Sequence, residues 1–491
     1  MRLGVLFLVS VTILDAASPL AKRLDAILQS TPASARAHWG VMVVDLPTGR
    51  TIYARNFKHH FVPASNTKLF STALALERLG PDYRMVTRLV ASGSLTPSGV
   101  LEGDLTLVGG GDPSLSGREY PYQVKSKPFR RLEALERFAG SLAEKGVSRI
   151  RGDVIGDDTA YVWSPYPPGW AMDDATWEYG APVSALVIND NRLWVEVAPG
   201  GKPGDAARVK FDPPLAYFSV DNRVRTGESG AVRIQRSPGS LEMLLRGGIE
   251  MGAAPFRESL AVDDPALFAA IALRDAILRR GIAVEGRAVA RHRWAESVAD
   301  LKRGQPEAVS RGVELASRES PPLRQIVQIV NKVSQNLHAE LLLRETARVR
   351  RNIGSREAGL EEMKEFLRSV GIGEDDFVIH DGSGLSRLNL LTPEAVVKLL
   401  RYMDKSPNRE AWLESLPVGG EDGTLSGRFR GTAAAGRVRA KTGTLSHVSA
   451  LGGYLERPNG RRLAFSVFVN NAQASSGAVR AVMDKVVAAL M

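Results

Sequence analysis

The sequence predicts a mixed α/β (α+β) fold in which both ends of the chain build one outer domain and the middle forms a large β-rich insertion of one or two domains. Two observations predict this division. Helix-like and strand-like patterns are mixed near both ends, whereas residues 160–260 are rich in Pro, Gly and Trp and show short strand-like runs without helices. The 491 residues also suffice for about three domains. We therefore expect the outer domain at 18–85 and 311–491, and an inserted region of two subdomains at 86–310.

The first residues have the pattern of a secretory signal peptide. Arg2 precedes an apolar run at 3–14, and small residues follow at Ala16 and Ala17. The run is too short to cross a bilayer comfortably, so we expect residues 1–17 to be an export signal and the protein to be periplasmic. The alternative is that the run forms a buried N-terminal strand.

The first part of the outer domain should contain a hairpin and a helix. Apolar Gly40–Val44 and Thr51–Ala54 flank the turn residues Asp45–Gly49, which is typical of two paired strands. A helical pattern then runs over Ser65–Leu79 and ends before Gly80. Further helices and strands follow the same periodicities. The expected helices are Leu132–Lys145, Asp264–Arg280, at least two within Leu323–Val349, Glu357–Val370, Pro393–Met403 and Ser476–Leu490, and the expected strands lie in Met85–Val108, Val147–Val162, Ala283–Ala290, Ala450–Glu456 and Leu463–Asn470.

The composition of the chain excludes several kinds of partner and active site. Lys and Arg number 64 against 54 Asp and Glu, a formal charge of +10 that either aids solubility or attracts a membrane surface or anionic envelope polymers. The basic residues are spread along the chain and no zinc-finger or RNA-binding signature accompanies them, so nucleic acid is not an expected partner. The absence of cysteine excludes thiol nucleophiles and disulfides. The seven histidines include no His-x-x-x-His pair, so we expect neither a metal nor another cofactor.

Ser65 and Lys68 begin the first strong helix pattern. Their i, i+3 spacing places them on the same helix face. A helix N-terminus favours negative charge developing on a serine, and a partly desolvated lysine beside it can lose its proton and act as a base. A capped helix with a solvated lysine would give the same four-residue pattern.

Two more polar clusters occur later in the chain. Ser334 and Asn336 fall within a helical stretch, where a turn would direct a hydroxyl and an amide into a shared cleft. Lys441 and Thr442 precede apolar strand sequence and would point to opposite faces of an edge strand. Such an edge can pair with an extended peptide, and Gly443 would let its backbone come close. Either cluster alone is equally typical of a polar surface.

Together, in the order Ser-x-x-Lys, Ser-x-Asn and Lys-Thr-Gly, the three clusters resemble the penicillin-recognising serine enzymes. The long interval between Ser65 and Ser334 is similar to that of the D-Ala-D-Ala carboxypeptidase/endopeptidase group, the class C low-molecular-mass penicillin-binding proteins. The resemblance implies a transpeptidase-like domain, an antiparallel sheet flanked by helices. Further matching segments are Gly103–Leu107, Gly110–Pro113, Gly152–Val154, Tyr179–Pro182, Asp381–Arg387 and Gly423–Leu425.

The resemblance also implies roles for these residues. Ser65 would attack the carbonyl between two D-alanines and Lys68 would take its proton. Ser334 would pass a proton to the leaving amine with electrostatic support from Lys441, and Asn336 would bind the substrate backbone.

Substrate contacts follow from the same resemblance. Thr442 would hold the terminal carboxylate, and the backbone N–H groups of Ser65 and Thr444 would form the oxyanion hole beside Gly443. Arg387 would bind the free carboxylate of a diaminopimelate side chain, unless it only fixes its loop.

Asp157 or Asp158 would meet the amine of that side chain, unless both merely cap a turn. The expected partners are peptidoglycan stem peptides and, as covalent inhibitors, β-lactam antibiotics. Two alternatives stay open: a β-lactamase or esterase on the same scaffold, and a catalytically silent cell-wall-binding protein. The intact Ser65, Lys68 and Lys441 argue against the silent protein.

Overall fold

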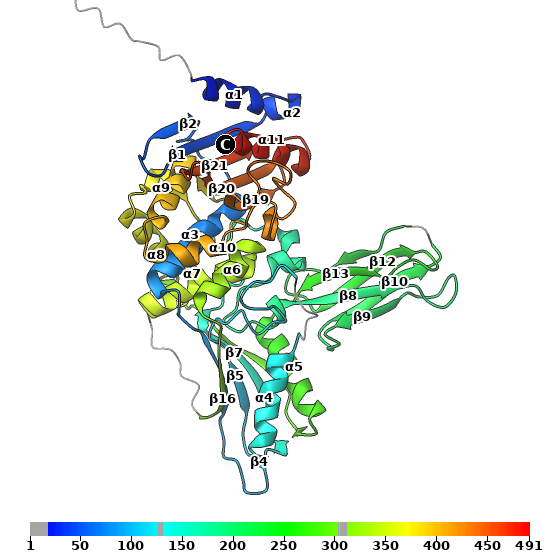
Figure 1. The fold of residues 1–491 in the computed structure, drawn as a ribbon. Coiled ribbons are helices and arrows are strands. Elements are labelled where there is room, and N and C mark those ends of the chain that lie inside the picture. The colour runs from blue at the N-terminus through cyan, green and yellow to red at the C-terminus, as the bar shows by residue number, and fades with distance from the viewer. Residues whose placement is uncertain (1–17, 126–130, 229, 303, 305–311) are drawn as a thin grey trace, which may run out of the picture.

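The computed structural model describes residues 18–125, 131–228, 230–302, 304 and 312–491. The two ends of the chain meet in one antiparallel sheet (Figure 1). Its strand order is β19-β20-β21-β1-β2, with bounds β19 (Val438–Leu445), β20 (Val448–Glu456), β21 (Arg462–Asn470), β1 (His38–Asp45) and β2 (Thr51–Arg55). The predicted signal segment at 1–17 lies outside the described residues.

Helices cover both faces of this sheet, which explains why the central strand β21 is buried along nearly its whole length. On one face, α1 (Pro19–Leu28) and α11 (Ser476–Ala488) share a core with the sheet. On the other face, α9 (Pro393–Met403) lies on the sheet beside α3 (Thr67–Leu79). Helix α3 is buried along most of its length because it runs through the middle of the domain, against α6, α7 and α8. The other helices of the outer domain are α2 (Pro32–Ala35), α6 (Leu323–Lys332), α7 (Asn336–Arg351), α8 (Arg356–Ser369) and α10 (Arg409–Ser415).

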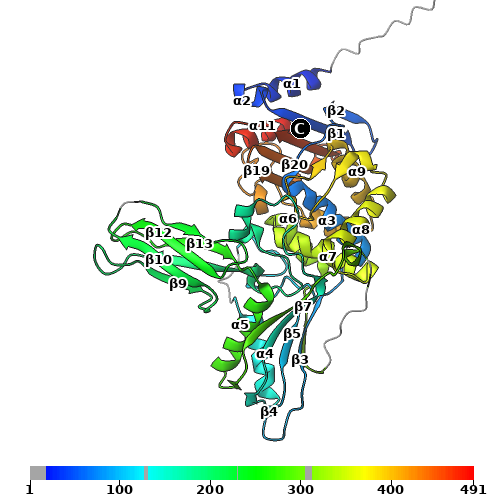
Figure 2. The same ribbon diagram turned by 180° about the vertical axis from the view of Figure 1, so that it is seen from behind.

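The described chain between α3 and α6 forms a small sheet of order β14-β6-β4 and two larger β structures. One is a five-stranded sheet of order β15-β7-β5-β3-β16, covered by α4 (Glu133–Glu144) and α5 (Pro265–Arg279). The second consists of two three-stranded sheets, which project away from the outer domain (Figures 1 and 2). Strand bounds are β3 (Val86–Ala91), β4 (Val100–Leu101), β5 (Leu105–Val108), β6 (Arg149–Ile150), β7 (Val154–Val162), β8 (Arg192–Ala198), β9 (Arg208–Asp212), β10 (Ser219–Thr226), β11 (Arg233–Gln235), β12 (Glu242–Ile249), β13 (Phe256–Ala261), β14 (Ala283–Val284), β15 (Ala288–Arg293), β16 (Val313–Glu319), β17 (Phe377–Val378) and β18 (Leu390–Leu391).

Strand β16 closes the large sheet of the inserted region. It pairs antiparallel with β3, the first strand after α3, and then leads into α6. Because β16 follows residue 310, this sheet extends past the expected end of the insertion.

The predicted mixed fold, with an antiparallel outer sheet flanked by helices and an added β-rich region, is confirmed. Helix α9 has the predicted bounds because Thr392 accepts a hydrogen bond from the Ala395 N–H and Pro393 suits the first turn. The expected helical stretch at 323–349 is divided into α6 and α7 by the turn that carries Ser334. Within the described residues, no helix is both long and apolar enough to cross a membrane.

Candidate active site

Ser65 lies in a 3₁₀ turn, η1 (Ala64–Asn66), that leads directly into α3. The α-helix therefore begins at Thr67, two residues after the predicted start. Ala64 has φ +47°, an uncommon conformation for a residue with a Cβ. Neighbouring backbone fixes this turn: a Cβ on Gly384 would lie 1.9 Å from the Ala64 carbonyl oxygen, so that loop packs closely only through a glycine.

Lys68 is fully buried one turn after the serine. Its Nζ donates hydrogen bonds to Ser65 Oγ at 2.9 Å, to Asn336 Oδ1 at 2.6 Å and to the Ser383 carbonyl oxygen at 2.6 Å. Burial lowers the pKa of Lys68 to about 7, against the opposing effect of the Asp381 and Glu340 charges. A large share of this amine is therefore neutral near pH 7 and can take the Ser65 proton.

The turn between α6 and α7 brings the second cluster to the same place. Ser334 has φ +63°, which reverses the chain after α6, and Asn336 is the first residue of α7. Ser334 Oγ accepts a hydrogen bond from Lys441 Nζ at 2.8 Å. Asn336 Nδ2 donates to the Tyr179 carbonyl oxygen of the inserted region at 2.8 Å, so its amide lies between Lys68 and the insertion.

Strand β19 contributes the third cluster from the edge of the outer sheet, as predicted. Lys441 is fully buried, and both its burial and the nearby Lys68 charge hold its pKa well below the usual range. Asn66 Nδ2 donates to the Lys441 carbonyl oxygen at 3.0 Å, which ties the nucleophile turn to the strand. A Cβ on Gly443 would lie 2.7 Å from the Pro63 carbonyl oxygen. A glycine at this position therefore allows β19 to pack against the nucleophile turn. The sequence analysis expected a different reason for this glycine, the close approach of a ligand backbone.

A cavity of about 320 Å³ opens in front of these groups. Its lining includes the hydroxyl side chains of Ser65, Ser334, Thr424, Thr442 and Thr444. Thr442 Oγ1 donates to Thr424 Oγ1 at 2.8 Å. Two arginines, Arg428 and Arg480, also line this cavity, and neither was predicted as a site residue.

The loop at 381–387 supports Lys68 from behind. The buried Asp381 carboxylate accepts hydrogen bonds from the N–H groups of Gly384 and Ser386, at 2.8 and 2.7 Å, and from Trp170 Nε1 at 2.9 Å. Glu340 is a buried residue of α7 that the sequence did not single out. It accepts from the N–H groups of Gly382 and Ser383 at 2.8 Å each, and burial raises its pKa to about 7. Both carboxylates thus orient the Ser383 carbonyl that Lys68 contacts. The residues of this support are Trp170, Glu340, Asp381, Gly382, Ser383, Gly384 and Ser386.

Arg387 is exposed at the end of this loop, on the side of the insertion. Its N–H donates to the Gly169 carbonyl oxygen at 3.1 Å. Burial raises the pKa of Asp174, and the positive charge of Arg387 lowers it. The Arg387 guanidinium therefore lies close to the Asp174 carboxylate. The adjoining Tyr179 carbonyl is the group that Asn336 contacts, so Arg387 lies near the insertion side of the active site.

Asp157 and Asp158 are placed elsewhere. Both are buried in β7 of the inserted region. Asp157 accepts from the Thr159 N–H and hydroxyl and pairs with Arg291. Asp158 accepts from Ser184 Oγ at 2.8 Å and contacts His292 Nδ1 at 2.9 Å. Neither belongs to the described lining of the cavity at Ser65, so the structure does not bring them to the nucleophile. The residues that engage them are Thr159, Ser184, Arg291 and His292.

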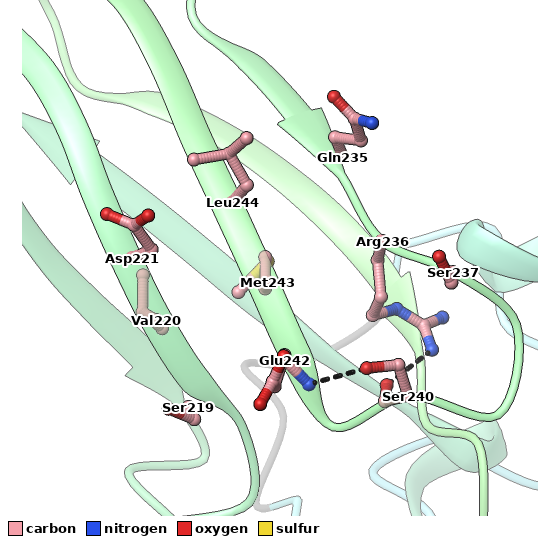
Figure 3. A pocket seen from close by; sticks show the side chains of 10 residues that line it. All are labelled: Ser219, Val220, Asp221, Gln235, Arg236, Ser237, Ser240, Glu242, Met243 and Leu244. Carbon is pink, nitrogen blue, oxygen red and sulfur yellow. Dashed lines mark hydrogen bonds between the residues drawn. The ribbon is translucent and has the colours of Figure 1, made fainter.

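A larger cavity of about 490 Å³ lies on the sheet β10-β12-β11 (Figure 3). The guanidinium of Arg236 beside it is already engaged by Asp263 and by the carbonyl oxygens of Ala175, Ala261 and Ser240. None of the three clusters contributes to its described lining. Chemistry, rather than size, therefore assigns the candidate active site to the smaller cavity.

Comparisons with known proteins agree with this arrangement. The sequence profile of the D-Ala-D-Ala carboxypeptidase 3 (S13) family matches residues 20–490. A D-alanyl-D-alanine carboxypeptidase of Actinomadura sp. (strain R39) is 36% identical over 482 residues, which cover 95% of this chain and 83% of that protein. The D-alanyl-D-alanine carboxypeptidase DacB of Haemophilus influenzae is 25% identical, over 88% of this chain and 85% of that protein.

A solved structure has the same fold. The crystal structure of penicillin-binding protein 4 (dacB) from Haemophilus influenzae superimposes with a TM-score of 0.80 at 24% identity, covering 95% of this chain and 98% of that one. A second structure of that protein, complexed with a β-lactam, gives a TM-score of 0.75 at 23% identity over the same shares of the two chains.

Proposed function

Because the chain belongs to the D-Ala-D-Ala carboxypeptidase 3 (S13) family, we propose that it is a serine-type D-Ala-D-Ala carboxypeptidase/DD-endopeptidase that acts on peptidoglycan peptides. The observation that carries this proposal is the 2.9 Å contact between Ser65 Oγ and the Lys68 amine, whose pKa burial lowers to about 7. An otherwise unreactive alcohol thereby has a base in hydrogen-bond contact with it.

Acylation starts with transfer of the Ser65 proton to neutral Lys68. Ser65 Oγ forms a bond to the carbonyl carbon between the two D-alanines, and the carbonyl oxygen becomes an oxyanion. The N–H groups of Ser65 and Thr444 stabilise that charge, each donor by about 3 kcal/mol. Asn336, whose amide lies between Lys68 and the insertion, positions the substrate backbone.

Breakdown of this intermediate needs a proton on the leaving amine. The Ser334 hydroxyl delivers its own proton and recovers one from Lys441, which lies 2.8 Å away. The C–N bond then breaks and the terminal D-alanine leaves. Water then loses a proton, through the Ser334 hydroxyl, to Lys441, which is neutral at this stage, and attacks the Ser65 ester. Lys68 gives its proton back to Ser65 Oγ as the ester bond breaks, and the shortened peptide leaves. Each proton taken from Ser65 or water is thus returned to Ser65 or to Lys441, and the enzyme is restored.

Arg387 is the proposed contact for the free carboxylate of a diaminopimelate side chain. Its exposed guanidinium lies on the insertion side, close to Asp174. Asp157 and Asp158 are engaged within β7 and its neighbours, so the amine of that side chain needs a different partner. For the domain limits, the pairing of β3 with β16 supports an inserted region that ends at residue 319 rather than 310.

The proposed location is the periplasm, on the strength of the signal-like segment at 1–17. The formal charge of +10 supports peripheral contact with anionic envelope polymers or a membrane surface. N-terminal sequencing of the protein recovered from the periplasm of an expressing bacterium tests export: an intact Met1 in the cytoplasmic fraction alone would contradict it.

Labelling with fluorescent penicillin tests the reaction. The wild-type protein should carry a durable label, and Ser65→Ala should carry none. Rapid turnover of the label would indicate a β-lactamase, and an unlabelled wild type would indicate a silent wall-binding protein. Mass analysis of a muropeptide mixture after incubation then identifies the bond that is cleaved; loss of one terminal alanine is the expected carboxypeptidase product.

A further inference from the structure

The cavity in front of Ser65 is built for an anion. Its described lining contains hydroxyl groups and two arginines but no Asp or Glu. The two lysines behind it are enclosed and bonded to other groups, Lys68 to Ser65 and Lys441 to Ser334. A fixed positive charge that can meet a ligand must therefore come from the rim.

The two rim arginines differ in one respect. Arg428 is neutralised, because its Nε lies 3.0 and 3.2 Å from the two carboxylate oxygens of Asp484 on α11. Arg480 lies one helical turn before Asp484, at the spacing that normally allows an ion pair. The Asp484 carboxylate forms its ion pair with Arg428 instead. Among the described residues, Arg480 forms no salt bridge, and its guanidinium donates to Thr444 Oγ1 at 3.3 Å.

This contact places Arg480 over the end of β19 where Thr444 lies. Thr444 and Thr442 are two residues apart, so both side chains project from the same face of the strand. The Thr442 hydroxyl belongs to the same cavity. A carboxylate between the two hydroxyls would meet the guanidinium, which binds carboxylates through paired hydrogen bonds.

We propose that Arg480, on the C-terminal helix, is a specificity-determining residue that binds the free carboxylate next to the cleaved amide bond. This inference depends on the proposed function and adds the group that recognises the leaving D-alanine. The guanidinium remains charged through the catalytic cycle, since it exchanges no proton with the reacting atoms. It therefore favours peptides that end in a carboxylate over the same peptides with a neutral end.

The test compares two substrates, an acylated peptide ending in D-Ala-D-Ala and the same peptide with a C-terminal carboxamide. Arg480→Ala should lower kcat/KM for the acid roughly 10- to 100-fold, mainly through KM, and leave the amide nearly unchanged. Arg480→Lys should restore part of the preference. Lys485→Ala is the matched control, because it removes one exposed positive charge from the same helix outside the described cavity lining. If hydrolysis of the amide is too slow to follow, the amide is used as an inhibitor of hydrolysis of the acid, and its inhibition constant takes the place of KM.

Each outcome decides between explanations. An equal loss on acid and amide would show that Arg480 only supports the structure, and no loss on either substrate would show that it does not contact the carboxylate. An equally large effect of Lys485→Ala would show that the positive charge of the surface attracts the substrate in general, without a specific contact to Arg480. If the wild type itself cleaves neither peptide, it is the proposed function, rather than the role of Arg480, that fails.

Discussion

Lys68 of α3 and Lys441 of β19 lie close enough that the charge of Lys68 helps to hold the pKa of Lys441 well below its usual range. Each amine contacts a different serine, Ser65 in one case and Ser334 in the other. Two ammonium groups buried near each other repel one another, so at least one of the two is expected to be neutral over much of the working pH range. In the proposed mechanism, this pair would accept a proton at Ser65 while it supplies one at Ser334.

Lys68→Arg should keep a positive charge beside Ser65 but abolish the base, because a guanidinium does not lose its proton in proteins. We expect acylation by fluorescent penicillin to fall roughly 10²- to 10⁴-fold, measured as the rate of labelling at saturating reagent. A thermal unfolding scan controls for damage to the buried site. A folded Lys68→Arg variant that is labelled at the wild-type rate would remove Lys68 from the role of base.

The acylation rate should rise with pH through a midpoint near 7. The sign follows from the base: protonated Lys68 cannot accept the Ser65 proton, and the neutral fraction grows as the pH passes the lowered pKa of about 7. Stopped-flow labelling between pH 5 and 9 measures this limb, whose midpoint belongs to the coupled lysine pair. Glu340→Gln should move the midpoint to lower pH, because the Glu340 charge opposes the lowering of the Lys68 pKa. A flat profile in the wild type would contradict the mechanism.

Gly443→Ala should disturb the nucleophile turn. The added Cβ would lie 2.7 Å from the Pro63 carbonyl oxygen and about 3 Å from Ala64 Cβ, so β19 must move away. We expect a loss of about 1–3 kcal/mol in unfolding free energy and slower acylation, measured by denaturant unfolding and by labelling. Gly477→Ala is the control, because a Cβ there meets no atom within 4 Å. Equal behaviour of the two variants would show that the close approach at Gly443 is unimportant.

Arg387→Ala should reduce cleavage of peptides that carry diaminopimelate. The expected loss in kcat/KM is roughly fivefold, since the side chain is exposed and its ion pair with the substrate is partly screened. Peptides with lysine at the same position lack that carboxylate and should be affected less, as should acylation by penicillin. Equal losses on all three ligands would reject the assignment of Arg387 to a side-chain pocket.

Local patterns in the sequence were sufficient to predict most of the outer domain. The helical pattern predicted α9, and apolar runs on both sides of the turn residues Asp45–Gly49 predicted the β1–β2 hairpin. The order of the three polar clusters led us to expect that they meet, and the structure brings them together at one cavity. Lys68 donates to both Ser65 and Asn336, and Lys441 donates to Ser334. Their catalytic roles stay predictions.

Other features depend on contacts between distant residues, which one sequence does not reveal. Nothing local in Val313–Glu319 indicates that it pairs with β3, more than 200 positions earlier in the chain. In the sequence, Arg480 is indistinguishable from any exposed arginine of a helix. Only the structure shows that Asp484 pairs with Arg428 and that Arg480 contacts Thr444. Asp157 and Asp158 matched the chemistry expected of an amine contact, but burial in β7 directs both carboxylates to other partners.

The inserted region cannot be regarded as a detachable accessory. The indole of Trp170 and the carbonyl of Tyr179 both come from it, and they hold Asp381 and Asn336 from the outer domain. A shortened protein in which α3 was joined directly to α6 would leave the buried Asp381 carboxylate and the Asn336 amide without those partners. Attempts to miniaturise this scaffold would therefore have to retain the stretch around 168–180, even if the projecting β structure were dispensed with.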